Sequence, residues 1–185
     1  MYHTQIEAAR KGIITSAMQQ VAEREKYPAD FICTEVAAGR IVIPANPRHD
    51  NLNFIGIGRK LSTKINANIG NSALTGTPEN ELRKLHSAIA YGADTVMDLS
   101  TGGDISLIRQ KILKHSSVPV GTVPIYEITA RFGRQGINEK NLLKIIQEQA
   151  EQGVDYMTIH AGFLQKLLPC ALQRKLKIVS RRIDQ

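Results

Sequence analysis

Cysteine and aromatic residues are scarce in this chain of 185 residues. The two cysteines, Cys33 and Cys170, lie far apart, so the sequence contains neither a disulfide framework nor a CxxC metal site. Aromatic residues make up 5% of the chain and tryptophan is absent, so the stacking surfaces of single-strand nucleic-acid binders are scarce. No zinc-finger or RNA-binding motif is evident.

Long apolar runs are missing as well. The longest, such as Ile41–Ile43, are far too short to cross a bilayer. The first 15 residues lack the apolar core and the small-residue cleavage site of a secretory signal. The sequence therefore predicts a cytoplasmic protein without a membrane partner.

The basic excess is the clearest bias in composition, with a net charge of +7. Much of it comes from residues near the end: Lys166, Arg174, Lys175, Lys177, Arg181 and Arg182. Such an excess is typical of proteins that bind nucleic acids, anionic membranes or phosphorylated small molecules. With so few aromatic residues, a solvated basic helix face is the simpler interpretation, and we do not expect nucleic acid as a partner.

A repeated strand–helix pattern organises residues 61–185. In Asp94–Gly103 a strand-forming stretch ends in polar residues, turns on two glycines and leads into a helix that Asp104 caps. Further strands are expected at 64–70, 118–124, 156–160 and 177–180. The tripeptide Gly92-Ala-Asp94 recurs as Gly153-Val-Asp155, 61 residues later, a distance that fits two consecutive β/α repeats.

Residues 1–60 lie outside this pattern. A helix capped by Thr15 or Ser16 is expected to run through Glu25, and a second is expected to start at Pro28 and to end at Gly39. The stretch Gly56–Arg59, GIGR, lacks the spacing of a dinucleotide fingerprint and predicts a plain turn. We predict an α/β protein: an N-terminal helical cap and loop over 1–60, then a partial (β/α)8 TIM-type barrel over 61–185, with about four to five parallel strands and outer helices.

Polar or soft side chains lie at or near the carboxyl end of each expected strand, where barrel enzymes build their sites. They are Asn68, Asp98 beside Met97, Tyr126, His160 and Ser180. Taken singly, each is as easily a loop hydrogen-bonding group or a core residue. Together they favour a shared pocket, to which Arg181 adds a guanidinium suited to phosphate oxygens. The set suits a phosphorylated heterocycle with ring nitrogens.

Five segments, in this order, resemble the phosphomethylpyrimidine synthase (hydroxymethylpyrimidine phosphate synthase) family of thiamine biosynthesis. They are NANIGNSA (66–73), GADTVMDLSTG (92–102), GTVPIY (121–126), EQGVDYMTIHAG (151–162) and IVSR (178–181). ARKGIIT near the start and IPAN (43–46) are similar to early segments of the family. The likeness spans almost the whole chain.

This resemblance implies a radical S-adenosylmethionine enzyme on a (β/α)8 barrel. The family is a carbon–carbon lyase that converts aminoimidazole ribotide into hydroxymethylpyrimidine phosphate with a deoxyadenosyl radical. Its cofactors are a four-iron–four-sulfur cluster, S-adenosylmethionine and a divalent metal such as zinc. The substrate contacts that the resemblance implies are Asn68, Met97, Tyr126, His160, Ser180 and Arg181, the last two near the phosphate.

The chain also departs from the family pattern. Arg182 stands where the family has glycine, and we expect a side chain at this position to crowd a backbone that must approach an anion. The chain ends at Gln185, before the family's Asp-Gly-Leu-Arg phosphate loop, a substrate glutamate, the metal-binding histidines and the three-cysteine cluster motif. A cluster needs cysteine thiolates, and Cys33 and Cys170 cannot provide three. We expect a C-terminally truncated member that lacks the cluster and metal ligands and is inactive alone.

A second class of function stays open beside the enzyme. The chain is then a non-catalytic half-barrel that binds a phosphorylated ligand or serves in assembly. A half-barrel exposes strand edges, so we expect either a homo-oligomer or association with the missing C-terminal half.

Overall fold

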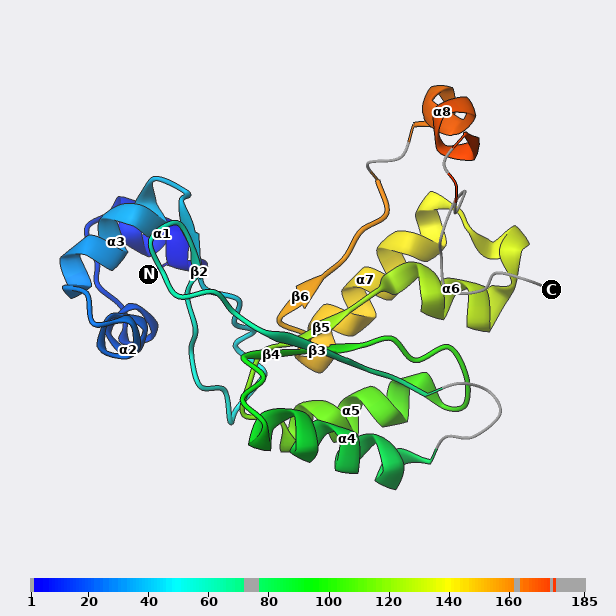
Figure 1. Cartoon of the computed structure of the whole chain (residues 1–185), viewed down its shortest axis with the longest axis horizontal. Coiled ribbons are helices and arrows are strands. Elements are labelled where there is room, and N and C mark those ends of the chain that lie inside the picture. The colour runs from blue at the N-terminus through cyan, green and yellow to red at the C-terminus, as the bar shows by residue number, and fades with distance from the viewer. Residues whose placement is uncertain (1, 72–76, 162–163, 174, 176–185) are drawn as a thin grey trace.

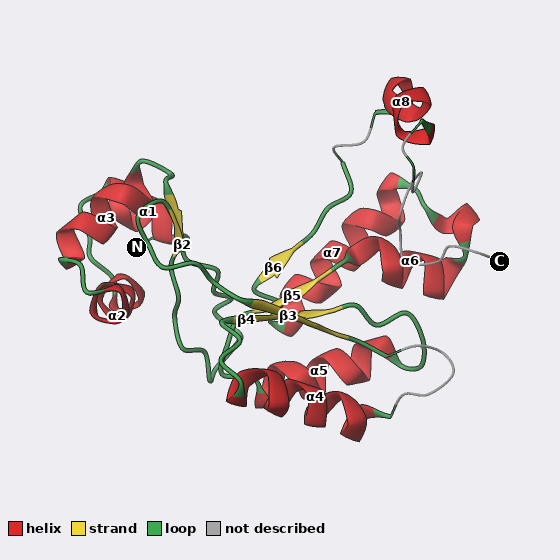
Figure 2. Ribbon diagram, in the orientation of Figure 1, coloured by secondary structure: helices red, strands yellow, loops and turns green. Residues whose placement is uncertain are grey.

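The computed structural model describes residues 2–71, 77–161, 164–173 and 175. An N-terminal group of helices lies beside a parallel sheet that is flanked by further helices (Figures 1 and 2). The sheet has four strands in the order β3-β4-β5-β6, each parallel to its neighbour. The predicted α/β fold, a partial TIM-type barrel after a helical segment, is confirmed.

The N-terminal part contains α1 (Gln5–Arg10), α2 (Ser16–Glu25) and α3 (Ala29–Ala37). Thr15 caps α2 by accepting a hydrogen bond from the N–H of Met18, as its position predicted. The three helices bury their own hydrophobic cluster, centred on Met18, Val21 and Ile32. In Figure 1 they lie together at the blue end of the chain, to one side of the sheet.

Two short strands, β1 (Ile41–Val42) and β2 (Ile57–Gly58), form an antiparallel pair after these helices. The turn predicted for residues 56–59 is therefore wrong for Ile57 and Gly58. A Cβ added at Gly58 would lie 2.3 Å from the carbonyl oxygen of Arg40. Glycine is needed here because two backbones approach closely, and not because the chain turns.

The remaining elements alternate between strand and helix. They are β3 (Asn66–Ile69), α4 (Pro78–Ala90), β4 (Thr95–Asp98), α5 (Ile105–His115), β5 (Val120–Thr122), α6 (Pro124–Phe132), η1 (Arg134–Gly136), α7 (Glu139–Gln152), β6 (Tyr156–Met157), η2 (Gln165–Leu167) and α8 (Leu168–Leu172). Thr77, Asp104 and Asn138 cap α4, α5 and α7, as predicted. The strand expected at 177–180 lies outside the described residues.

Two elements differ from the sequence prediction. Pro124 does not end a strand but begins α6, a helix whose preceding residue, Val123, makes no side-chain cap. Strand β6 covers Tyr156–Met157 and stops short of residue 160. The second difference moves His160 from the expected strand into the loop after β6, and the first places Tyr126 in a helix.

The two faces of the sheet differ in what covers them. The helix-covered face carries Ala67, Ile69, Val96, Val120 and Met157, which pack with Leu85 of α4 and with Ile108 and Ile112 of α5. Figure 1 shows α4 and α5 side by side along the sheet. By the strand register, the opposite face, called the open face below, carries Asn66, Asn68, Thr95, Met97, Gly121 and Tyr156.

The repeated Gly-X-Asp tripeptide fixes the amino ends of the strands. In each copy the glycine has a positive φ, +88° and +107°, and the aspartate stands just before a strand. Asp94 Oδ2 accepts from the N–H of Ile65, and Asp155 Oδ2 accepts from the N–H of Val120, both at 2.8 Å. Each aspartate also pairs with a basic side chain of the N-terminal part: Arg24 and His49 respectively. The repeat therefore ties the N-terminal part to the sheet.

Candidate functional site

Asn68 and Met97 are neighbours on the open face. The parallel register pairs Asn68 of β3 with Met97 of β4, close to the carboxyl end of both strands. Asn68 is exposed, and Met97 is half-buried, with its Sδ 4.0 Å from the hydroxyl oxygen of Thr158. An amide beside a polarisable thioether suits the edge and the face of a small heterocycle.

The rings of Tyr126 and His160 contact each other, with centroids 6.1 Å apart and planes at 39°. The prediction that His160 ends a strand is wrong, whereas Tyr126 follows a strand as predicted. Tyr126 lies in the first turn of α6 and His160 in the loop after β6, because β5 ends at Thr122 and β6 at Met157. Since parallel strands all leave the sheet at one end, the ring pair lies at the same end as Asn68 and Met97.

The predicted phosphate contacts, Ser180 and Arg181, lie outside the described residues, as does Arg182. A different basic pair lies next to Asn68. A groove of about 740 Å³ between β3 and α4 is lined by Asn68 and by Arg83 and Lys84 of α4. Lys84 pairs with the buried Glu81 at 2.7 Å. The groove therefore combines cations with a hydrogen-bonding amide at the edge of β3.

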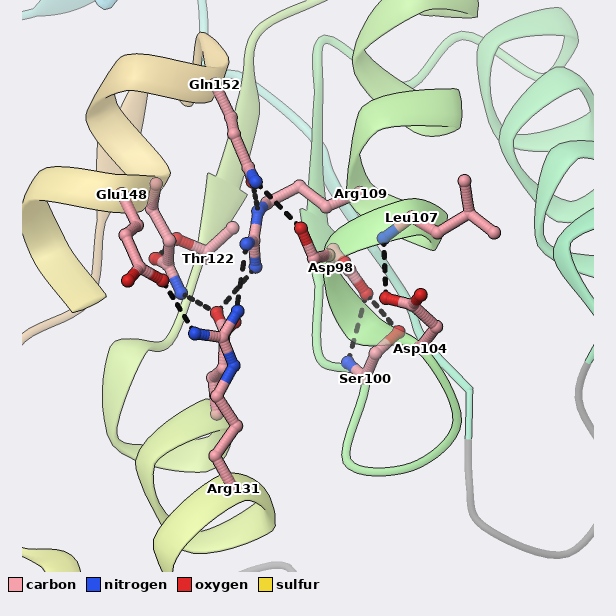
Figure 3. Close-up of polar contacts among 12 residues, drawn as sticks. Asp98, Ser100, Asp104, Leu107, Arg109, Thr122, Arg131, Glu148 and Gln152 are labelled. Carbon is pink, nitrogen blue, oxygen red and sulfur yellow. Dashed lines mark hydrogen bonds and ion pairs between the residues drawn. The ribbon is translucent and has the colours of Figure 1, made fainter.

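Asp98, the carboxylate next to Met97, faces away from this site. It is 4% exposed, and its Oδ1 accepts hydrogen bonds from the N–H and the hydroxyl of Ser100, at 3.0 and 2.5 Å (Figure 3). Burial raises the pKa of Asp98 above its ordinary value, against the opposing effect of the Ser100 hydrogen bonds. Asp98, a candidate from the sequence, therefore lies outside the open face and holds the loop after β4 in place.

A buried ion-pair network lies on the helix-covered side of the strand ends (Figure 3). Arg109 of α5 donates through Nη1 to Glu127 Oε2 of α6 at 2.7 Å, and the two residues are 1% and 2% exposed. Gln149 of α7 donates to the same oxygen at 2.7 Å and accepts from the hydroxyl of Thr122 at 2.6 Å. Because Glu127 follows Tyr126 in the chain, this network fixes the turn that carries Tyr126.

A second set of contacts, on the open face, was also missed from the sequence. Asn66 Oδ1 accepts from the hydroxyls of Thr95 and Tyr156, at 2.9 and 3.1 Å. Asn66 Nδ2 donates to Asn68 Oδ1 at 2.8 Å. Alternation in KINANIG indicates that the two asparagines share a face, but the contacts with other strands depend on register. Burial raises the pKa of Tyr156 above 10.0, although Thr95 opposes the shift.

The cysteines do not fit an iron–sulfur cluster. Cys33 is buried in α3, with its Sγ 3.8 Å from the carbonyl oxygen of Ala9, and Cys170 is exposed on α8. A cluster needs several thiolates at one point, and these two thiols lie on different elements. Within the described ranges, no group of three or more His, Cys, Asp or Glu residues is arranged to hold a metal ion. Over the same ranges, no helix has the length and apolar character needed to span a membrane.

Comparison with known sequences decides the family. A sequence model described as the radical SAM ThiC family matches residues 4–182. The chain belongs to the radical SAM ThiC family. Membership implies an iron–sulfur cluster and S-adenosylmethionine as cofactors of the family, so the lack of a suitable cysteine set concerns this stretch of sequence and not the family chemistry.

The relatives of this ThiC-family chain carry a specific name. The phosphomethylpyrimidine synthase of Natronomonas pharaonis is 54% identical over 179 residues, which make up 96% of this chain and 38% of that protein. The synthase of Haloarcula marismortui is also 54% identical over 179 residues, 37% of its length. The synthase of Halobacterium salinarum is 51% identical over 38% of its length. The resemblance found in the motifs is thus confirmed, and the chain spans less than two fifths of the curated relatives it matches.

Proposed function

We propose that this chain provides the substrate-binding strands of a phosphomethylpyrimidine synthase in thiamine biosynthesis. The reaction is the radical conversion of aminoimidazole ribotide to hydroxymethylpyrimidine phosphate, a carbon–carbon lyase reaction. One observation carries the proposal: the Asn68–Met97 pair and the Tyr126–His160 ring pair come from four different segments, and they lie at the same end of the sheet.

Each residue of this end has a distinct role in the proposal. Asn68 hydrogen-bonds the heterocycle through its amide, and the Met97 thioether packs on the ring. The Tyr126–His160 ring pair lines the side of the pocket opposite Asn68 and Met97. Ser180 and Arg181 bind the phosphate, a role that rests on the sequence alone. Arg182 follows them where the family has glycine, so phosphate binding by this chain shows that the glycine is not required.

We propose that S-adenosylmethionine is a cofactor and that the ligands of the cluster and of a divalent metal such as zinc lie outside these 185 residues. When bound, the cluster supplies the electron that cleaves S-adenosylmethionine. The chain alone is then inactive. After anaerobic reconstitution with iron and sulfide it is expected to form no deoxyadenosine, and deoxyadenosine formation by the chain alone contradicts this part of the proposal.

Binding of aminoimidazole ribotide, measured by isothermal titration calorimetry, tests the central part directly. Loss of one or two hydrogen bonds in Asn68→Ala weakens binding about 10-fold. The matched control is Asn51→Ala, because Asn51 contacts the carbonyl of Lys114 at the end of α5, away from the site. Equal affinity of the two variants, or no binding by the unaltered chain, overturns the proposal.

An assembly function is the second candidate, because β3 and β6 are the edge strands of the described sheet. Ile65 before β3 and Ile159 after β6 are 58% and 44% exposed. We propose that a second copy of the chain, or the portion present in the longer relatives, covers these edges. A folded monomer at micromolar concentration in sedimentation equilibrium contradicts the homo-oligomer. The cytoplasmic location stays a prediction.

A further inference from the structure

Asn66 connects three strands on the open face. Its Oδ1 accepts hydrogen bonds from Thr95 of β4 and from Tyr156 of β6, and its Nδ2 donates to Asn68 Oδ1 at 2.8 Å. Strand β6 is separated from β3 by two intervening strands. The side chains of Tyr156 and Asn66 therefore meet across the two strands between them.

Gly121 of β5 makes this reach possible. A Cβ at this position would lie 2.3, 2.4 and 2.8 Å from the Cε2, Cζ and hydroxyl oxygen of Tyr156. The ring thus lies directly over the glycine backbone. Because any larger residue would lift the ring away from the sheet, Gly121 is part of the arrangement that delivers the tyrosine hydroxyl to Asn66.

The direction of these hydrogen bonds sets the orientation of the Asn66 amide and, through it, the orientation of the Asn68 amide. With Asn66 Oδ1 held by two hydroxyls, its NH2 group points to Asn68. The oxygen of Asn68 is then occupied. Within the described part of the chain the NH2 group of Asn68 makes no hydrogen bond, and Asn68 is exposed. Asn68 therefore presents a donor, and not an acceptor, to the open face.

We propose that Asn66 is a positioning residue that fixes the amide of Asn68 as a hydrogen-bond donor toward the ligand. The site then selects a ligand with an acceptor at this point, such as an unprotonated ring nitrogen of a heterocycle. This inference rests on the proposed function, because it takes Asn68 as a ligand contact.

Asn66→Asp tests the inference with a minimal change of shape. The carboxylate still accepts from Thr95 and Tyr156, but it cannot donate to Asn68. The Asn68 amide then turns to donate its NH2 to Asp, and its oxygen faces the ligand. We expect the affinity for aminoimidazole ribotide to fall about 10-fold or more. Asn66→Ala leaves the Asn68 amide free to turn either way, so we expect a fall of only about threefold.

The negative charge of Asn66→Asp also repels a phosphorylated ligand, and a double-mutant cycle separates the two effects. In an Asn68→Ala background no amide remains to be turned, so only the charge effect is left. We expect Asn66→Asp to weaken binding less than about threefold there. An equal loss in both backgrounds, or a larger loss in Asn66→Ala than in Asn66→Asp, overturns the inference.

An NMR measurement on the unliganded chain keeps this test independent of ribotide binding. In the proposed orientation, the side-chain amide protons of Asn66 show stronger nuclear Overhauser effects to the Asn68 side chain than to the Tyr156 ring. Stronger effects to the Tyr156 ring than to Asn68 show the opposite orientation and overturn the inference, even when the ribotide binds. The proposed orientation without any ribotide binding overturns the proposed function instead, and with it the ligand selection inferred here.

Discussion

The two sides of the sheet use the same kind of polar side chain for different purposes. On the helix-covered side, Arg109 and Glu127 are almost fully buried and are paired with each other and with neighbouring amides. On the open face, Asn66 and Asn68 are exposed, and Asn66 donates a hydrogen bond to Asn68 along β3. Polar groups that are enclosed on all sides hold elements together, and polar groups left at a surface are available to a ligand.

The largest expected effect on stability comes from removing a buried charge on the helix-covered side. Glu127→Gln removes the carboxylate that Arg109 and Gln149 contact, and it leaves the guanidinium of Arg109 buried without its counter-charge. We expect the free energy of unfolding in urea to fall by about 3–5 kcal/mol. The control is Glu148→Gln, a more exposed partner of Arg131, with an expected loss below about 1 kcal/mol. Similar losses in both variants contradict the distinction between enclosed and exposed charges.

A smaller effect, dependent on pH, is expected at the amino end of the sheet. His49 Nδ1 lies 2.7 Å from Asp155 Oδ2, and Nε2 lies 3.0 Å from the carbonyl oxygen of Ser116. Burial alone lowers the pKa of His49, but the hydrogen bond and charge of Asp155 outweigh it, so the pKa is raised above 6.5. A raised pKa means that protonated His49 stabilises the fold. This contribution is complete below pH 6.5 and is lost as the pH rises through the folded-state pKa.

Urea unfolding of His49→Gln checks this prediction. The variant is expected to be less stable than the unaltered chain by about 1–3 kcal/mol at pH 6, and the difference is expected to shrink toward pH 9. A difference that stays constant or grows with pH shows that the charge of His49 makes no contribution.

The third effect concerns the open face itself. Gly121→Ala places a methyl group within 2.3 Å of the Tyr156 ring, so we expect a loss of about 1–3 kcal/mol from displacement of that ring. In a Tyr156→Ala background the clash is absent, and the same substitution is expected to stabilise the chain by about 0.4–1 kcal/mol through the unfolded state. Thermal or urea unfolding of the four proteins measures both values. If Gly121→Ala destabilises the chain equally with and without the Tyr156 ring, the added methyl group does not clash with that ring.

The smallest effect on stability is expected at Asn68, although its effect on binding is large. Asn68→Ala removes an exposed amide from β3, so we expect the free energy of unfolding to change by less than about 0.5 kcal/mol. Comparison with Glu127→Gln in one urea series tests the contrast between the two sides. A loss above about 2 kcal/mol would make Asn68 a structural residue and would remove the reason for assigning it to a ligand.

Local signals in the sequence predicted most helix boundaries. Thr15, Thr77, Asp104 and Asn138 carry cap chemistry that needs no information from elsewhere in the chain. Helix α6 was not predicted, because Val123 provides no side-chain cap and because PIYEITARF is rich in β-branched residues. Its stability comes from the tertiary contacts of Glu127, which no local pattern reveals.

The candidate site was predictable only in part. The rule that parallel strands open on one end placed Asn68 at the carboxyl end of its strand, but the pairing of Asn68 with Met97 depends on the strand register, which the sequence did not predict. The sequence did not predict the orientation of Asp98 either. Both Val96 and Met97 are apolar, so alternation alone cannot decide which face of the strand is buried. The contact of Tyr156 with Asn66 depends on the register of four strands and on the glycine between them.

Titration of the ¹⁵N-labelled chain with aminoimidazole ribotide, followed through backbone amide shifts, tests the central claim most directly. The account predicts the largest changes at Asn68, Met97, Tyr126 and His160, at the carboxyl end of the sheet, and little change at Asp94 and Asp155 at the amino end. Saturable changes confined to the N-terminal helices or to the amino end, or no change at millimolar ribotide, would contradict it.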